Sequence, residues 1–286
     1  MRPMGPARLR RTAVAATAVW AGAVLAGSTV VPSPAGALGA PGSCGRPSGC
    51  TAFELQHAGS SYGWYPVRHR HEFKGAKPAA WVKGAGGQLW TTKGMLTLNG
   101  RRGDLSATWT GAAYDRGRWE VRMRTDQNNV RAAHAPGLTD YLVKVELVPV
   151  TEEHCGAEGV TLLAYHPSEP TTAGFAVHSL PNLTHTASLT TRRPVGRSRW
   201  HTFAVELADD HVSWFVDAKV VATQPTSTPL LDVPLQMRVS LVATPGATMR
   251  PTKVQLDWAR YWPLTKPNKK PLTAPPLTEG RYDAAC

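Results

Sequence analysis

Short segments with alternating apolar and polar side chains run from Leu89 to Trp262, and this period of two constrains the fold more than any other feature. In residues 119–123, Trp, Val and Met alternate with Glu and Arg, so one face of the strand is buried and the other meets water. After residue 37, no segment carries an apolar stripe at helical spacing over ten residues. Many short strands without intervening helices predict an all-β sandwich or barrel. Strands are predicted at 95–98, 119–124, 141–150, 160–165, 175–178, 203–207, 212–216, 235–242 and 254–262.

The first 37 residues have the features of a secretory signal peptide. A region with four arginines precedes the apolar stretch 12–31, and Ala-Gly-Ala at 35–37 offers a cleavage site before Leu38. The stretch is long enough to span a bilayer, so a retained anchor is the alternative, but two following prolines and the small-residue site favour cleavage. We therefore expect a secreted, extracellular protein without a membrane span. The arginine pair at 10–11 leaves Sec and twin-arginine export both open.

Composition divides the remaining chain into a Gly/Pro-rich segment at 38–52, a folded domain at 53–262 and a Pro-rich extended tail at 263–286. Removing the four leader arginines from 32 basic residues leaves 28, against 20 acidic residues, a net charge of +8. The chain lacks a basic helix, zinc-ligand spacing and a ribonucleoprotein-type aromatic motif, so we expect no nucleic-acid partner. Weak attraction to an anionic cell-wall polymer is compatible with the charge. We expect a monomer.

Four cysteines, an even number in an exported chain, predict two disulfide bonds: Cys44, Cys50, Cys155 and Cys286. The spacing alone allows three connectivities. The Gly-Arg-Pro-Ser-Gly sequence between the first two can turn and bring them together, so we expect Cys44–Cys50 and Cys155–Cys286. The second bond would hold the end of the tail close to Glu158. None of the cysteines has metal-ligand spacing, and no metal or cofactor is predicted.

Four stretches carry recognisable motifs: 71–98, with His-Glu-Phe-Lys-Gly, a tryptophan and Gly-Met-Leu-Thr-Leu; 114–124, with Arg-Trp-Glu-Val-Arg; 200–219, with Trp-His-Thr-Phe-Ala-Val-Glu and Trp-Phe-Val-Asp-Ala-Lys; and 254–261, with Asp-Trp-Ala-Arg. In this order they resemble glycoside hydrolase family 16, the laminarinase, lichenase and agarase family. The third is the most specific. One departure is Ala218, where the family has a turn glycine. The resemblance implies a two-sheet antiparallel β-sandwich, a concanavalin A-like jelly roll, whose concave face holds a polysaccharide.

The nine tryptophans after the leader suit a polysaccharide partner, because an indole face stacks on the C–H face of a sugar ring. Trp119, Trp214 and Trp258 alternate with polar residues, which favours the core. The substrate-binding candidates lie in less regular surroundings: Trp64, Trp81, Trp90 and Trp109.

The resemblance breaks down at the catalytic strand. The family carries Glu-x-Asp-x-x-Glu on one strand, because a retaining glycosidase needs two carboxyl groups about 5–5.5 Å apart. The corresponding strand here runs from 158 to 165. Placing Glu158 on the first Glu puts Val160 and Leu163 at the other two positions. Placing Val160 on the family's Ile instead gives, in order, Gly159, Thr161 and Ala164.

Neither register keeps more than one carboxylate. Glu158 is the catalytic candidate, with Glu153 of the preceding loop as its partner, although a flexible loop holds carboxylates poorly. Three hypotheses stay open: a polysaccharide-binding protein with little or no hydrolysis, an active glycosidase using Glu158 with an unusual partner, and a non-catalytic structural protein of the cell envelope.

Overall fold

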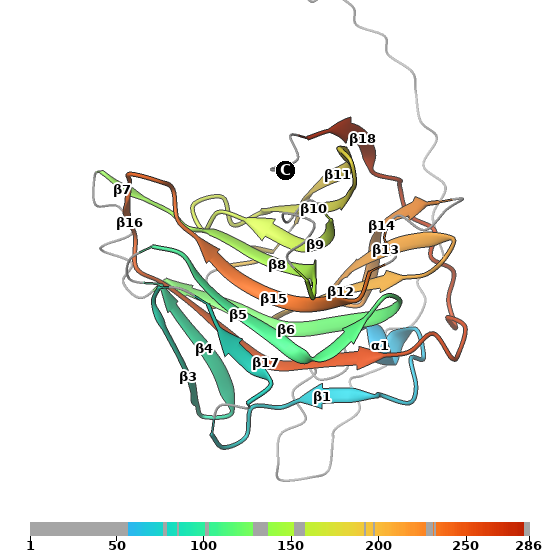
Figure 1. Cartoon of the computed structure of the whole chain (residues 1–286), viewed down its shortest axis with the longest axis horizontal. Helices are drawn as coiled ribbons and strands as arrows, with labels where there is room; N and C mark the ends of the chain where they lie inside the picture. Colours follow the sequence, from blue (N-terminus) through green and yellow to red (C-terminus); the bar gives the residue numbers. More distant parts are fainter. Residues whose placement is uncertain are drawn as a thin grey trace, which may run out of the picture. The chain divides into compact units, whose positions relative to one another are not determined.

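The computed structural model describes residues 57–282, apart from 77–78, 85, 101–102, 128–136, 152–157, 192, 197, 227–230 and 232. These residues build two large antiparallel sheets, here called sheet A and sheet B, which pack face to face (Figure 1). The one helix in this part of the chain is the single turn α1 (Ala58–Ser61). The predicted all-β, two-sheet jelly roll is confirmed.

Sheet A has the order β14 (Lys219–Pro225), β13 (His211–Val216), β12 (His201–Leu207), β6 (Gly117–Gln127), β17 (Thr252–Trp262), β4 (Met95–Gly100) and β3 (Gln88–Thr92), and β1 (His69–His71) also pairs with β17. Sheet B has the order β18 (Thr278–Arg281), β11 (Leu183–Thr190), β10 (Thr172–Ser179), β9 (Gly159–Tyr165), β8 (Leu142–Pro149), β15 (Leu235–Val242), β5 (Leu105–Tyr114) and β2 (Trp81–Lys83). A short parallel pair joins β16 (Thr248–Met249) to β7 (Leu138–Thr139).

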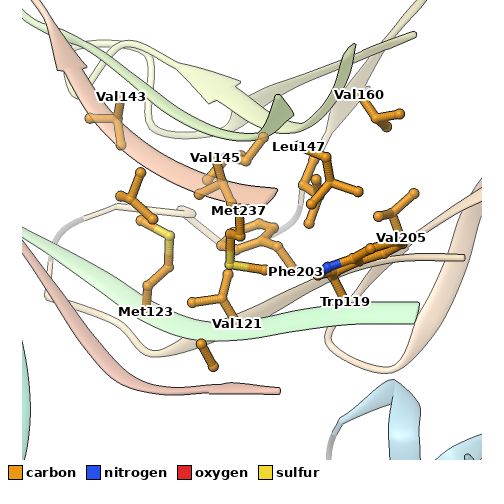
Figure 2. Packing of buried hydrophobic residues seen from close by; sticks show 14 of the residues in the cluster. Trp119, Val121, Met123, Val143, Val145, Leu147, Val160, Phe203, Val205 and Met237 are labelled. Carbon is orange, nitrogen blue, oxygen red and sulfur yellow. The ribbon is translucent and has the colours of Figure 1, made fainter. Parts of the chain in front are cut away.

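The core lies between the two sheets and follows directly from the alternation in the sequence. Every second residue of β6 and of β8 points inward and is buried, whereas the residues between them point outward. Figure 2 shows these inward side chains meeting, among them Trp119, Val121 and Met123 from β6 and Val143, Val145 and Leu147 from β8. Strands β5, β6 and β15 are bent, with the outward face of sheet B on the inside of the bend (Figure 1).

A second apolar cluster covers part of the outward face of sheet A. It joins α1 and the residues after it to outward positions of β12, β13 and β17: Ala58, Tyr62, Trp64, Ala204, Phe215 and Trp262. The α1 turn is anchored there because buried Glu120 of β6 accepts hydrogen bonds from the backbone N–H groups of Ala58 (2.6 Å) and Gly59 (3.2 Å). The outward face of sheet A is therefore in part a second interior.

The tail beyond Trp262 packs on the sandwich. Lys269 N–H donates to the carbonyl oxygen of Tyr62 (3.0 Å), and the Asn268 amide donates to Glu206 (2.9 Å). Further on, β18 pairs with the edge strand β11. The described part of the segment beyond 262, which the proline-rich composition predicts to be extended, contacts both sheets.

The hairpin turn between β13 and β14 has alanine where a glycine would be expected. Asp217 and Ala218 both have positive φ, 47° and 65°. This left-handed conformation costs an L-residue with a side chain about 1–2 kcal/mol relative to glycine. The surrounding hairpin holds the turn in place, with Asp217 accepting hydrogen bonds from Thr202 N–H (3.0 Å) and the His201 ring (2.7 Å).

Candidate functional site

Strand pairing decides which residues of β9 point outward from sheet B. Thr161 is paired with Glu146 of β8 and Ala176 of β10, and Ala164 is paired with Lys144 and Gly174. The pairing of β9 with β8 and its pairing with β10 both shift register between these two positions. β9 therefore contains one extra residue there, a β-bulge. Because Glu146 and Lys144 point outward, Thr161 and Ala164 do as well.

Gly159 is paired with His178 of β10, two residues before Thr161 on the same face. The outward positions of β9 are thus 159, 161 and 164, the spacing of Glu-x-Asp-x-x-Glu. The other register does not fit, because Val160 and Leu163 are 1% and 0% exposed and belong to the core. The strand and its bulge have the geometry that three acids would need, and the residues there are glycine, threonine and alanine.

Glu158 lies just before β9 and is buried. Burial raises the pKa of Tyr282, and the negative charge of the Glu158 carboxylate raises it further. The proposed partner Glu153 lies outside the described residues, as do all four cysteines, so the pairing of the acids and the disulfides stays a prediction.

Next to the outward face of β9 lies a charged cluster that we call the Glu146 triad: Lys144, Glu146 and Arg238. The Glu146 carboxylate forms ion pairs with Lys144 on its own strand and with Arg238 of β15 (3.3 Å between Nη2 and Oε2). Each oxygen of the Glu146 carboxylate is therefore engaged by a cationic partner. Arg238 meets Glu146 because of the β8–β15 register, which spacing along the sequence does not reveal.

His178 and Tyr282 border the same face. Burial lowers the pKa of His178, and the nearby Lys144 charge lowers it further while Glu146 opposes the shift, so the imidazole is neutral at neutral pH. The Tyr282 ring meets the His178 ring edge to face at 4.8 Å between centroids. Tyr282 is brought there by β18 and by its own N–H, which donates to the carbonyl oxygen of Asn182 (3.1 Å). The tail therefore approaches the face at the position of Gly159.

Three of the four tryptophans expected to stack on sugars are fully buried: Trp64, Trp81 and Trp109 are each 0% exposed. Trp81 and Trp109 face inward from paired strands β2 and β5 and stack on one another, with ring centroids 6.0 Å apart. Trp64 is covered by the second apolar cluster and donates its indole N–H to Asn268 (2.6 Å). With no indole face open to a ligand, the stacking role predicted for these three does not fit the structure.

Trp90 is the partly exposed member of the four. It lies on the edge strand β3 of sheet A and lines a shallow hollow of about 480 Å³ together with Lys83, Gln88 and Leu89. Trp119 and Trp214 lie in the core, as expected. Trp258 was expected in the core as well, but it is buried on the outward face of sheet A, where the Arg260 guanidinium lies over its ring.

Within the described ranges, no group of three or more His, Cys, Asp or Glu side chains is placed to hold a metal ion. In the same part of the chain, no helix combines the length and apolarity needed to cross a membrane.

The sequence matches no known family model, and no curated protein matches it significantly. Solved structures do match in fold. The catalytic domain of an endo-1,3-β-glucanase (laminarinase) from Thermotoga petrophila RKU-1 aligns with a TM-score of 0.57 and 13% identity, covering 72% of this chain and 100% of that one. A GlcNAcα1-4Gal-releasing endo-β-galactosidase from Clostridium perfringens aligns with a TM-score of 0.57 and 12% identity, covering 71% of this chain and 64% of that one.

A non-specific endo-β-1,3(4)-glucanase of glycoside hydrolase family 16 aligns with a TM-score of 0.56 and 12% identity, covering 69% of this chain and 94% of that one. At these identities the likeness is one of fold. In fold, the chain is a glycoside hydrolase family 16-like jelly roll.

Proposed function

We propose that the chain is an exported family 16-like protein that binds an extracellular polysaccharide of the β-glucan or galactan type on the outward face of sheet B, with little or no hydrolysis. The observation that carries the proposal is the identity of the outward residues of β9, Gly159, Thr161 and Ala164. The leader-like residues 1–37 support export. The structural neighbours act on glucans and galactans, which supports the choice of ligand class.

The chemistry argues against hydrolysis on this face. Retaining and inverting glycosidases each use two carboxyl groups across the scissile bond, one of which protonates the leaving oxygen. The outward positions of β9 supply none, and Glu146, an outward carboxylate on the neighbouring strand β8, is engaged by Lys144 and Arg238. Glu158 is buried and lies just before the strand, outside the outward positions 159, 161 and 164.

The face retains features that suit binding. Its centre has small side chains at 161, 164, 174 and 176, so a chain of sugar rings can approach the backbone closely. Hydrogen-bonding groups surround that centre on the neighbouring strands, including Lys144, Arg238 and His178. Sugar hydroxyls need such groups in fixed positions to be recognised.

The test measures binding and product formation on the same preparations. Wild-type protein is incubated with laminarin, lichenan and agarose, reducing ends are assayed, and binding is followed by calorimetry with oligosaccharides of each. We expect binding to at least one glycan and no products. Products that appear with wild type and vanish in Glu158→Gln would overturn the proposal in favour of an active glycosidase, and absence of any binding would favour an envelope structural protein.

A variant pair locates the binding face. Ala164→Trp places a bulky side chain at the centre of the outward face of β9, and we expect it to abolish glycan binding. Lys219→Trp makes a comparable change at an exposed position of β14 on sheet A and should bind as wild type does. Equal affinities in the two variants would place the glycan elsewhere.

A further inference from the structure

A charged hollow of about 530 Å³ lies on the outward face of sheet A, on the opposite side of the sandwich from β9. Five cationic side chains line it, from β1, the segment after β1, the β3–β4 turn, β6 and β17: Arg70, Lys74, Lys93, Arg122 and Arg260. Two carboxylates, Glu72 and Asp257, line it as well. We call this hollow the basic pocket.

The positive charge in the basic pocket exceeds what its own acids can neutralise. Glu72 is shared by two guanidinium groups, Arg70 and Arg260, each 3.0 Å away. Asp257 is paired with Arg122 at 2.6 Å. Lys74 and Lys93 are exposed and have no carboxylate partner among the residues that the structure describes. Five cations against two carboxylates leave a formal excess of three positive charges.

Two of the arginines are held rigidly. Arg122 and Arg260 come from the central strands β6 and β17, and their side chains are only 17% and 20% exposed. The Arg260 guanidinium lies over the Trp258 ring at 4.1 Å, and Arg122 lies over the Trp200 ring at 5.2 Å. A guanidinium fixed by a ring and a carboxylate loses little freedom when it binds a further ligand.

Lys93 stands on a separate, equally defined support. Lys93 and Gly94 both have positive φ, 49° and 74°, the conformation of a tight hairpin turn. This turn joins β3 to β4 and sets Lys93 at the edge of the pocket. The pocket thus combines rigid arginine forks at its floor with exposed lysines at its rim.

We propose that the basic pocket binds an oxyanion, a carboxylate or a phosphate, carried on an acidic polysaccharide. Arginine forks match the paired oxygens of both groups, and lysine adds a point charge that can follow the ligand. The volume suits one sugar unit with its charged substituent. The proposal is independent of the glycan site on sheet B, and it assigns a definite location to the attraction for anionic polymers that the net charge of +8 suggests.

The test compares four probes by calorimetry at low and at moderate salt: an oligogalacturonate, a phosphomannan, inorganic phosphate and a neutral laminarin oligosaccharide. We expect the pocket to bind one or both charged polymers, more weakly as salt rises. The polymer that binds more tightly identifies carboxylate or phosphate as the natural group. A lack of binding to all three anionic probes would overturn the proposal.

Matched variants separate a built site from general attraction. Lys74→Gln/Lys93→Gln removes two exposed charges and should weaken binding about three- to tenfold, as expected for two partly screened contacts. Lys219→Gln/Lys266→Gln removes the same charge from exposed positions away from the pocket and should leave affinity within about twofold. Equal weakening in the two pairs would show non-specific attraction and refute the site.

A charge-neutral variant tests the forks. Arg122→Gln/Asp257→Asn keeps the net charge and removes one guanidinium, so we expect weaker binding of the charged polymers. The dependence of that binding on salt, which the two lysines cause, should not change. Unfolding curves for every variant confirm that folding is retained. The Ala164→Trp variant should bind the charged probes as wild type does, so failure of the sheet B proposal leaves this one standing. If Ala164→Trp alone abolished that binding, the basic pocket would not be the site.

Discussion

The outward faces of the two sheets differ in how their charges are satisfied. On sheet A, the Arg118–Glu206 ion pair is almost fully buried, and Glu206 also accepts hydrogen bonds from His211 (2.9 Å) and Asn268 (2.9 Å). On sheet B, the Glu146 triad is only partly covered, with side-chain exposures of 27% for Lys144 and 39% for Arg238. The first set is enclosed by the tail and the second apolar cluster, whereas the second remains accessible.

This contrast shows that a charged residue on an outward face is not by itself a sign of function. Among the side chains of sheet A that the structure describes, Glu120 and Glu206 are the most buried acids. Each is saturated by local donors, so their role is to attach α1 and the tail. The basic pocket lies on the same face and differs because its cations outnumber their partners. A charged side chain whose partners satisfy it fully is structural, whereas one that lacks enough partners is available to a ligand.

The largest effect is expected from breaking the enclosed set. Glu206→Ala leaves Arg118 buried without its carboxylate, and we expect a loss of about 3–5 kcal/mol in the free energy of unfolding, measured by urea denaturation. Glu146→Ala is the matched change on sheet B and should cost about 1 kcal/mol or less, because both cations can turn to solvent. Equal losses would mean that the two faces do not differ as described.

The second prediction concerns the outward positions of β9. A Cβ added at Gly159 would lie 2.7 Å from the carbonyl oxygen of Leu147, closer than such atoms can pack. We expect Gly159→Glu to lower the free energy of unfolding by about 2–3 kcal/mol, as overpacking does. Ala164 already has a Cβ on that face, so Ala164→Glu should change the free energy of unfolding by less than about 1 kcal/mol.

Restoring all three family acids therefore meets a backbone obstacle at its first position. The triple variant Gly159→Glu/Thr161→Asp/Ala164→Glu should show the full loss of the glycine substitution and no hydrolysis of laminarin. A stable triple variant that releases reducing ends would contradict this prediction and show that β9 accommodates the acids as the family strand does. The loss of catalysis would then be due to these three side chains alone.

The third prediction uses pH to test the enclosed set. Burial alone would raise the pKa of Glu206, but the hydrogen bond from His211 and the Arg118 charge lower it below its ordinary 4.5. The hydrogen bond to Glu206 raises the pKa of His211 above its ordinary 6.5, against a smaller effect of burial. The Glu206 contribution to stability is thus lost as pH falls below about 4.5, and the His211 contribution is lost as pH rises above 6.5.

His211→Gln should accordingly lower the free energy of unfolding by about 1–2 kcal/mol near pH 6 and by much less near pH 9. Denaturation curves at both pH values measure the difference. His166→Gln, at an exposed position, is the control and should show no such dependence. A penalty for His211→Gln that is the same at both pH values would mean that the charged imidazole does not stabilise the pair.

The fold was predictable because alternation is local. All nine strands expected from the period of two are present, since inward Trp, Val, Leu and Met side chains mark them residue by residue. The nine other strands were not expected: β1, β2, β3, β5, β7, β11, β14, β16 and β18. β11 carries mostly small polar side chains, and β18 holds a glycine and three polar residues, so their extended form depends on pairing with each other and with β10.

The site was less predictable because it depends on tertiary contacts. The sequence left two registers open for β9, and only pairing with β8 and β10 locates the bulge that turns 159, 161 and 164 outward. Trp64 lies in irregular sequence and was expected at the surface, yet α1 and the tail bury it on a face that would otherwise be exposed. The period of two identifies the inward face of each strand, but it does not predict which segments cover the outward face.

The smallest expected effect tests whether the tail also covers sheet B. Tyr282→Ala removes the ring that meets His178, and we expect a loss of about 0.5–1.5 kcal/mol in the free energy of unfolding. Because burial is the main cause of the lowered pKa of His178, the variant should raise that pKa toward 6.5, which an NMR titration of the imidazole would detect. Tyr65→Ala, at a residue that is 56% exposed, is the control and should change neither quantity.

The Tyr282→Ala variant also carries information on function. If the tail narrows the glycan face, Tyr282→Ala should bind longer oligosaccharides more tightly than wild type. Unchanged binding with a shifted His178 pKa would mean that the ring covers the histidine and lies outside the path of the glycan, and an unchanged pKa would show that the tail does not shield this face.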